Sequence, residues 1–137
     1  GKTLVTTVND LSDKDFFKGV ANPRFTAAPV LVDAMFQTGG LLEFFTTSRT
    51  VLPYRIRRMQ FFKAVARKTP YYCITEKKAS GDETNTYDLT LVDPQGRVYI
   101  EIRDFEMVKL NRLDAEDRIT GRVSWAGMAD RETVTAD

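Results

Sequence analysis

The sequence predicts an α+β domain in which an antiparallel sheet wraps around one long central helix. Three observations lead to this prediction: a long apolar segment that begins at a proline, four extended segments after it, and turn residues between those segments. The chain has 137 residues, of which 42% are hydrophobic, and this suits a single packed domain. We expect residues 1–110 to form the domain and residues 111–137 to be a carboxyl-terminal linker or extension.

The amino-terminal part predicts a short strand over residues 3–8, which are rich in β-branched side chains. Asp10 and Ser12 are candidate caps for a helical turn after this strand. Residues 19–29 contain two prolines and a glycine, so we expect an irregular loop before the main helix.

The central helix is predicted over residues 29–48, with Pro29 at a favourable first-turn position. Apolar side chains occur around most of its circumference, which is typical of a buried helix. Gly39 and Gly40 lie in its middle, and each costs up to about 1 kcal/mol relative to alanine. We therefore expect something to approach the helix closely there, either the backbone of a strand or a ligand.

Four extended segments follow the helix, over about residues 52–67, 70–79, 84–93 and 97–109. Turn residues separate them: Thr69-Pro70, Ser80-Gly81-Asp82 and Asp93-Pro94-Gln95-Gly96. Successive hairpins predict an antiparallel meander. One strand, a long helix and four long antiparallel strands make up the hotdog fold, which we expect here as a single copy.

The composition limits the possible chemistry. Twenty Lys and Arg against 19 Asp and Glu leave a net charge of +1, so no overall field favours nucleic acid or an anionic membrane. The chain contains no histidine, which excludes a Ser-His-Asp or Cys-His site built from this chain alone. Cys73 is the single cysteine, so neither an internal disulfide nor a zinc-binding thiol cluster is expected. No apolar run approaches a membrane span, and we expect a soluble cytoplasmic domain.

Asp33 and Gln37 are the strongest candidates for catalytic residues. Their i, i+4 spacing places both side chains on one face of the helix. A carboxyl group buried among apolar neighbours is costly to ionise, so we expect Asp33 to be a proton donor, with the Gln37 amide orienting it. The alternative, in which Asp33 only caps or salt-bridges the start of the helix, stays open on the residues alone.

The helix also carries a recognisable motif. Residues 29–37 read Pro-Val-Leu-Val-Asp-Ala-Met-Phe-Gln, which resembles the Pro-x-x-Leu-Asp-Ala-x-x-Gln segment of 3-hydroxyacyl-carrier-protein dehydratases. The segment is similar both to the bacterial 3-hydroxydecanoyl dehydratase and to the second hotdog of polyketide synthase dehydratase domains. Residues 52–56 read Leu-Pro-Tyr-Arg-Ile and are similar to the Leu-Pro-x-x-Ile that opens the next strand in the polyketide enzymes. The resemblance covers roughly residues 29–110.

The resemblance implies a function. In that family a histidine removes the α-proton of a 3-hydroxyacyl thioester, while the helix aspartate helps the 3-hydroxyl to leave as water. It implies that Asp33 is the acid and that Gln37 supports it. We also expect Pro29, Gly39 and Gly40 to lie beside the substrate. The resemblance implies no cofactor other than the phosphopantetheine arm that carries the substrate. Since this chain has no histidine, it resembles the carboxyl-terminal half of a double-hotdog dehydratase whose histidine lies on another hotdog.

The expected partners are an acyl carrier protein and a second hotdog, either an upstream half or another copy of this chain. A run of six basic residues without an acid could attract the acidic carrier protein: Arg55, Arg57, Arg58, Lys63, Arg67 and Lys68. A solvated strand face is the commoner explanation for such a run. Two other functions stay open, namely a hotdog acyl thioesterase that uses a helix carboxylate, and a non-catalytic structural hotdog of a synthase.

Overall fold

The computed structural model describes residues 2–8, 28–66 and 69–110 of the chain. In chain order they form the following elements: β1 (Lys2–Val8), α2 (Pro29–Thr47), β2 (Val51–Phe61), β3 (Tyr71–Ser80), β4 (Thr84–Val92) and β5 (Val98–Lys109). The predicted helix and strands are present with small shifts at their ends, except that the strand expected over 52–67 ends at Phe61. The helical turn expected after residue 10 and the extension over 111–137 lie outside the described residues.

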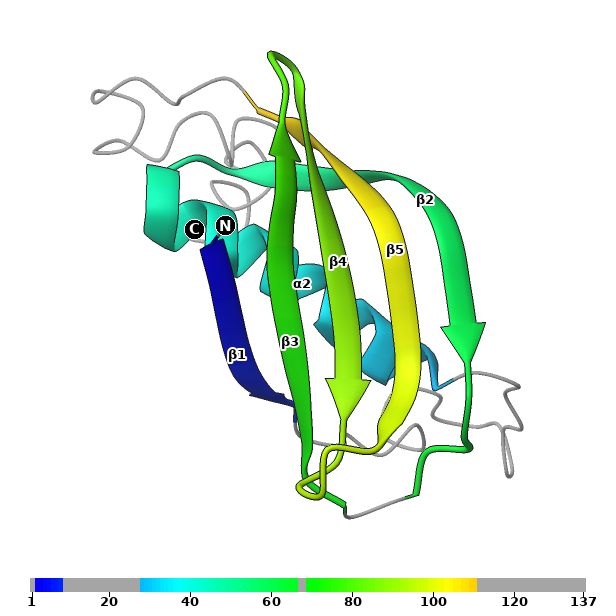
Figure 1. Cartoon of the computed structure of the whole chain (residues 1–137). Coiled ribbons are helices and arrows are strands. Elements are labelled where there is room, and N and C mark those ends of the chain that lie inside the picture. The colour runs from blue at the N-terminus through cyan, green and yellow to red at the C-terminus, as the bar shows by residue number, and fades with distance from the viewer. Residues whose placement is uncertain (1, 9–27, 67–68, 111–137) are drawn as a thin grey trace, which may run out of the picture.

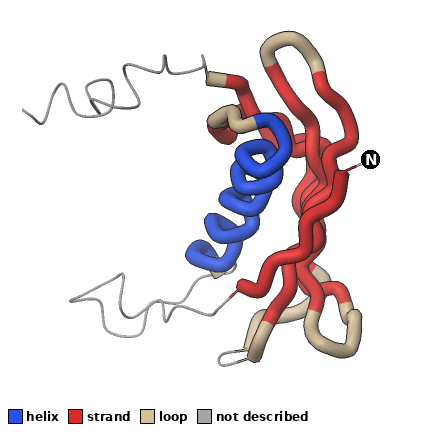
Figure 2. The backbone as a smooth tube through the Cα atoms, turned by 90° about the vertical axis from the view of Figure 1, so that its left-hand side faces the viewer, coloured by secondary structure: helices blue, strands red, loops and turns tan. Residues whose placement is uncertain are grey.

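The five strands form one antiparallel sheet in the order β1-β3-β4-β5-β2. Figure 1 shows α2 lying across one face of this sheet, and Figure 2 shows the sheet curving around the helix. A single long helix wrapped by an antiparallel sheet is the hotdog arrangement, so the predicted fold class is confirmed.

The predicted meander is wrong in one respect. Strands β3, β4 and β5 are neighbours in the sheet, but β2 pairs with β5 and not with β3. The connection over residues 62–70 is longer than a tight hairpin loop, and it carries the chain past β5 and β4 to the other half of the sheet. As a result β1 and β2 are the two edges of the sheet.

The two predicted hairpins are present. Residues 80–82 lie at the turn between β3 and β4. At the turn between β4 and β5, Asp93 Oδ1 accepts hydrogen bonds from the backbone N–H groups of Gln95 and Arg97, each at 3.0 Å. Gly96 has φ 77°, a left-handed conformation that glycine adopts without steric cost. Local turn chemistry therefore fixes the pairing of β4 with β5.

Helix α2 buries one face only, although its composition predicts a helix that is buried all round. Its buried residues recur with helical spacing and face the sheet: Leu31, Met35, Thr38, Gly39, Leu42 and Glu43. The inner face of the sheet completes the core with Tyr71, Cys73, Tyr87, Leu89, Leu91, Ile100, Ile102, Phe105 and Met107. A single sheet covers only one side of a helix, so Leu41, Phe44 and Phe45 stay exposed on the other side. Among the described residues there is no helix with the length and apolar character of a membrane span.

Candidate active site

A pocket of about 410 Å³ lies between the outer side of α2 and the beginning of β2. This volume falls in the range of small-molecule sites. Most of its lining is apolar and comes from Phe36, Leu41, Phe44, Val51, Leu52, Pro53 and Met107. Gly40 completes the helical wall, and the polar lining consists of Asp33, Gln37, Arg49 and Thr50. The pocket thus has an apolar wall and a small set of polar side chains.

Asp33 and Gln37 meet at this pocket. Gln37 Nε2 donates a hydrogen bond to Asp33 Oδ2 at 2.8 Å, as the spacing of one helical turn allows. Both side chains are exposed, so the predicted burial of Asp33 is wrong. The reason is that Asp33 lies off the buried stripe of α2 and faces away from the sheet. Asp33 neither caps the helix nor forms an ion pair with a described residue. None of the described contacts therefore supports the alternative in which Asp33 only caps or salt-bridges the start of the helix.

The two central glycines of α2 have different surroundings. A Cβ added to Gly39 would lie 2.9 Å from Sδ of Met107, so a side chain of the sheet makes the close approach at this position. A Cβ added to Gly40 would meet nothing within 4 Å, and Gly40 lines the pocket. Of the three residues expected beside a substrate, the pocket wall therefore includes Gly40 but neither Gly39 nor Pro29.

The three arginines considered for carrier-protein docking lie on the edge strand β2 and are exposed. Arg55 forms an ion pair with Glu106 of β5 at 2.6 Å, and Arg57 lies 3.9 Å from Asp104. Arg58 has no ion pair among the described residues. Two other members of the basic run lie outside the described residues, Arg67 and Lys68.

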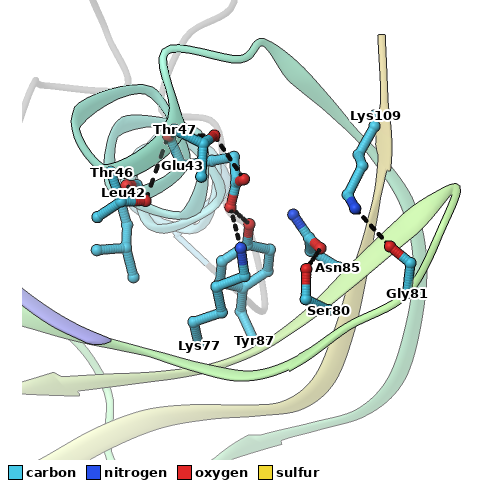
Figure 3. Close-up of polar contacts among 10 residues, drawn as sticks. All are labelled: Leu42, Glu43, Thr46, Thr47, Lys77, Ser80, Gly81, Asn85, Tyr87 and Lys109. Carbon is cyan, nitrogen blue, oxygen red and sulfur yellow. Dashed lines mark hydrogen bonds and ion pairs between the residues drawn. The ribbon is translucent and has the colours of Figure 1, made fainter. Parts of the chain in front are cut away.

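Glu43 is a buried ionisable residue of α2 that the sequence analysis missed. Its side chain faces the sheet (Figure 3), where Oε2 accepts hydrogen bonds from Lys77 Nζ at 2.7 Å and from Tyr87 Oη at 2.6 Å. Its Oε1 accepts a third from Thr47 Oγ1 at 2.7 Å. Burial by itself raises the pKa of Glu43, but these hydrogen bonds and the charge of Lys77 outweigh it and lower the pKa to about 2. Burial and the bond to Glu43 raise the pKa of Tyr87.

The Glu43 cluster attaches the helix to the sheet and does not line the pocket. The burial of Glu43 could have been predicted from its spacing in the sequence. It lies four residues after Gly39 and eight after Met35, on the same helical face. Its main partners could not have been found in this way. Lys77 and Tyr87 are 34 and 44 residues further along the chain.

Cys73 is buried in the core. Burial raises the pKa of its thiol, while hydrogen bonds with Thr38 and Thr75 oppose that change. Within residues 2–8, 28–66 and 69–110, no group of three His, Cys, Asp or Glu side chains is placed to hold a metal ion.

Comparison with known proteins identifies the family. The sequence model described as the polyketide synthase dehydratase N-terminal domain matches residues 5–117. The chain belongs to the polyketide synthase dehydratase family. The matching model describes the amino-terminal domain of these dehydratases, whereas the helix motif resembles their second hotdog, so the assignment to the carboxyl-terminal half stays a prediction. No curated protein matches the chain.

Solved structures share the fold. The dehydratase domain of a mycocerosic acid synthase-like polyketide synthase is 23% identical with a TM-score of 0.60, over 82% of this chain and 37% of that one. A hypothetical thioesterase from Streptococcus pneumoniae with coenzyme A is 17% identical with a TM-score of 0.60, over 79% of this chain and 78% of that one. A Streptococcus mutans protein bound to acetyl CoA is 13% identical with a TM-score of 0.62, over 79% of this chain and 81% of that one. This chain thus spans little more than a third of the length of that dehydratase domain.

Proposed function

We propose that this chain is one hotdog of a dehydratase that removes water from a 3-hydroxyacyl thioester on an acyl carrier protein. The observation that carries the proposal is the Asp33–Gln37 hydrogen bond of 2.8 Å at a largely apolar pocket. An apolar wall suits an acyl chain, and a carboxyl group at that wall suits proton transfer to a hydroxyl. Membership of the polyketide synthase dehydratase family supports this reaction.

In the proposed reaction a base removes the proton from C2 of the acyl chain and the C3–O bond breaks. The electron pair of the C2–H bond forms the C2–C3 double bond, and the leaving hydroxyl takes the proton of Asp33 to become water. Gln37 orients the Asp33 carboxyl group through its amide. Asp33 must then be reprotonated before the next turnover.

The base has to come from outside this chain, which contains no histidine. We place it on a second hotdog that pairs with the edge strand β2, next to the pocket. Large apolar side chains are exposed along and just after β2: Leu52, Tyr54, Ile56, Phe61 and Phe62. A strand edge with apolar side chains in contact with water favours pairing with another polypeptide.

Reconstitution tests the proposal. The full chain would be combined with a histidine-bearing hotdog of the same family, and dehydration of a 3-hydroxyacyl thioester would be followed by absorbance of the enoyl product. We expect Asp33→Asn to lower the rate by about 100-fold or more, on the usual scale for a positioned acid. The matched control is Asp82→Asn, because Asp82 is exposed in the β3–β4 turn and should leave the rate unchanged. A near-parental rate for Asp33→Asn would show that Asp33 is not the acid.

A second candidate is an acyl thioesterase, which the shared fold with the S. pneumoniae thioesterase favours. In that reaction the Asp33 carboxylate would promote hydrolysis of the thioester, and no histidine is strictly required. Hydrolysis of a saturated acyl thioester by this chain alone, lost in Asp33→Asn, would favour the thioesterase. If neither reaction is catalysed with or without the second hotdog, the chain is a structural hotdog.

A further inference from the structure

Met107 of β5 belongs both to the wall of the candidate pocket and to the buried core of the domain. It lines the pocket and yet is only 2% exposed, so most of its surface is packed inside the protein. Its Sδ fills the space that a Cβ of Gly39 would need, at 2.9 Å from that position. The absence of a side chain at Gly39 thus lets the thioether lie between the helix and the sheet.

A polar group lies behind Met107. Asn85 on β4 is the register partner of Met107, and both residues are buried on the inner face of the sheet. Paired side chains on one face of a sheet lie about 5 Å apart at Cβ. Asn85 Oδ1 accepts a hydrogen bond from Ser80 Oγ at 2.7 Å (Figure 3), but Asn85 Nδ2 has no hydrogen-bond partner among the described residues. Met107 therefore separates the apolar pocket from a buried amide.

We infer that Met107 sets the length of the acyl chain that this pocket accepts, an inference that rests on the proposed function. A chain entering past Gly40 ends against the Met107 thioether. To go deeper it would have to displace Met107, and an apolar chain end would then face the amide N–H of Asn85 without satisfying it. The unbranched methionine side chain can be shortened by substitution or displaced by a neighbour without a change in the backbone. The longest acyl chain that the pocket accepts can therefore be both increased and decreased.

Met107→Ala removes the three outer heavy atoms of the side chain and lengthens the pocket. Burying two more methylene groups of a ligand corresponds to a gain of roughly ten-fold in affinity. We therefore expect the variant to bind a thioester about two carbons longer than the parental optimum roughly ten-fold more tightly. Met59→Ala is the control, because Met59 of β2 is a methionine that packs against the same core but does not line the pocket.

Gly39→Ala tests the same limit on chain length by shortening the pocket. Its Cβ takes the space of the Met107 thioether, which then moves toward the pocket, where there is room. We expect this variant to bind shorter chains as the parent does and to lose affinity for the longest chain that the parent accepts. Gly39→Ala removes no core atom. Circular dichroism would show whether Met107→Ala folds. If it does not, Gly39→Ala still tests whether Met107 limits the length of the bound chain.

The experiment is a calorimetric titration of the full chain and these variants with 3-hydroxyacyl N-acetylcysteamine thioesters of increasing length. Opposite shifts of the preferred length in Met107→Ala and Gly39→Ala, with none in Met59→Ala, support the inference. If the parent binds thioesters and the folded variants keep its length preference, the inference is overturned while the proposed function stands. If none of the proteins binds any of the thioesters, the proposed function fails and this inference fails with it.

Discussion

Glu43 on α2 and Lys77 on β3 form an ion pair of 2.7 Å between the helix and the sheet. Tyr87 of β4 donates a hydrogen bond to the same carboxylate oxygen at 2.6 Å, so one helical side chain is bonded to two strands. A buried charge with all its partners is tolerated, whereas one that loses a partner is costly. We expect this cluster to determine how α2 sits on the sheet and thereby the shape of the neighbouring pocket.

Replacement of Glu43 by alanine should destabilise the fold. The variant leaves the Lys77 ammonium and the Tyr87 hydroxyl without their partner in a mostly buried site, so we expect the free energy of unfolding to fall by about 3 kcal/mol. Urea denaturation would measure it. Glu76→Ala is the control, since Glu76 is exposed on the same strand as Lys77, and it should change the value by less than about 0.5 kcal/mol. Equal effects of the two changes would show that the cluster adds no stability.

The stability should also depend on pH through Glu43. Its pKa is lowered from 4.5 to about 2, so the folded state binds fewer protons than the unfolded state in this range. The stabilisation is fully present above about pH 5 and is lost as the pH falls toward 2. Denaturation of the parent and of Glu43→Gln between pH 7 and pH 2.5 should give free energies that converge on acidification. Parallel curves would contradict this prediction.

Asp104 of β5 should tolerate glycine better than a β-branched residue. It has φ 51°, and its backbone N–H donates to Asp88 Oδ1 at 3.1 Å beside the register shift between β4 and β5. A left-handed conformation costs about 1–2 kcal/mol for residues other than glycine. Asp104→Val should therefore be less stable than Asp104→Gly by about that amount in thermal or urea unfolding. Equal stability of the two variants would mean that the backbone relaxes at this position.

Gln37 should be a positioning residue, since its amide donates to the carboxylate of Asp33. In the reconstituted dehydratase we expect Gln37→Ala to lower kcat by roughly ten-fold, less than Asp33→Asn, while KM stays close to the parental value. Gln37→Glu should also lower kcat, because a carboxylate cannot donate the hydrogen bond by which the Gln37 amide orients the Asp33 carboxyl group. A rise in KM at unchanged kcat in both variants would instead assign Gln37 to substrate binding.

The chain without a second hotdog should self-associate through β2. Paired lysine substitutions at Tyr54 and Ile56 place charges on this exposed edge and should shift the protein toward monomers in light scattering. Val5→Lys is the control on the opposite edge β1, where Val5 is also exposed, and it should leave the association unchanged. A parental chain that is monomeric at micromolar or higher concentration would contradict the prediction.

The elements with local signals could be predicted from the sequence alone. Pro29 marks the start of the helix, and the turn over residues 93–96 joins β4 to β5 through hydrogen bonds within five residues. Such features depend on neighbours along the chain, so their propensities are visible without a structure. The i, i+4 pairing of Asp33 with Gln37 belongs to the same class, because helical geometry alone brings these residues together.

Which side of each element is buried depends instead on the packing of the whole domain. The helix is apolar nearly all round, so its composition could not show that the sheet covers the face with Glu43 and leaves Asp33 exposed. The position of β2 beside β5 likewise follows from pairing between residues that are 39 to 58 positions apart in the sequence. The close approach of Met107 to Gly39 and the bonds of Glu43 to β3 and β4 are equally non-local. The physical reason is that burial is a property of the whole packed arrangement, whereas propensity and periodicity are properties of a segment.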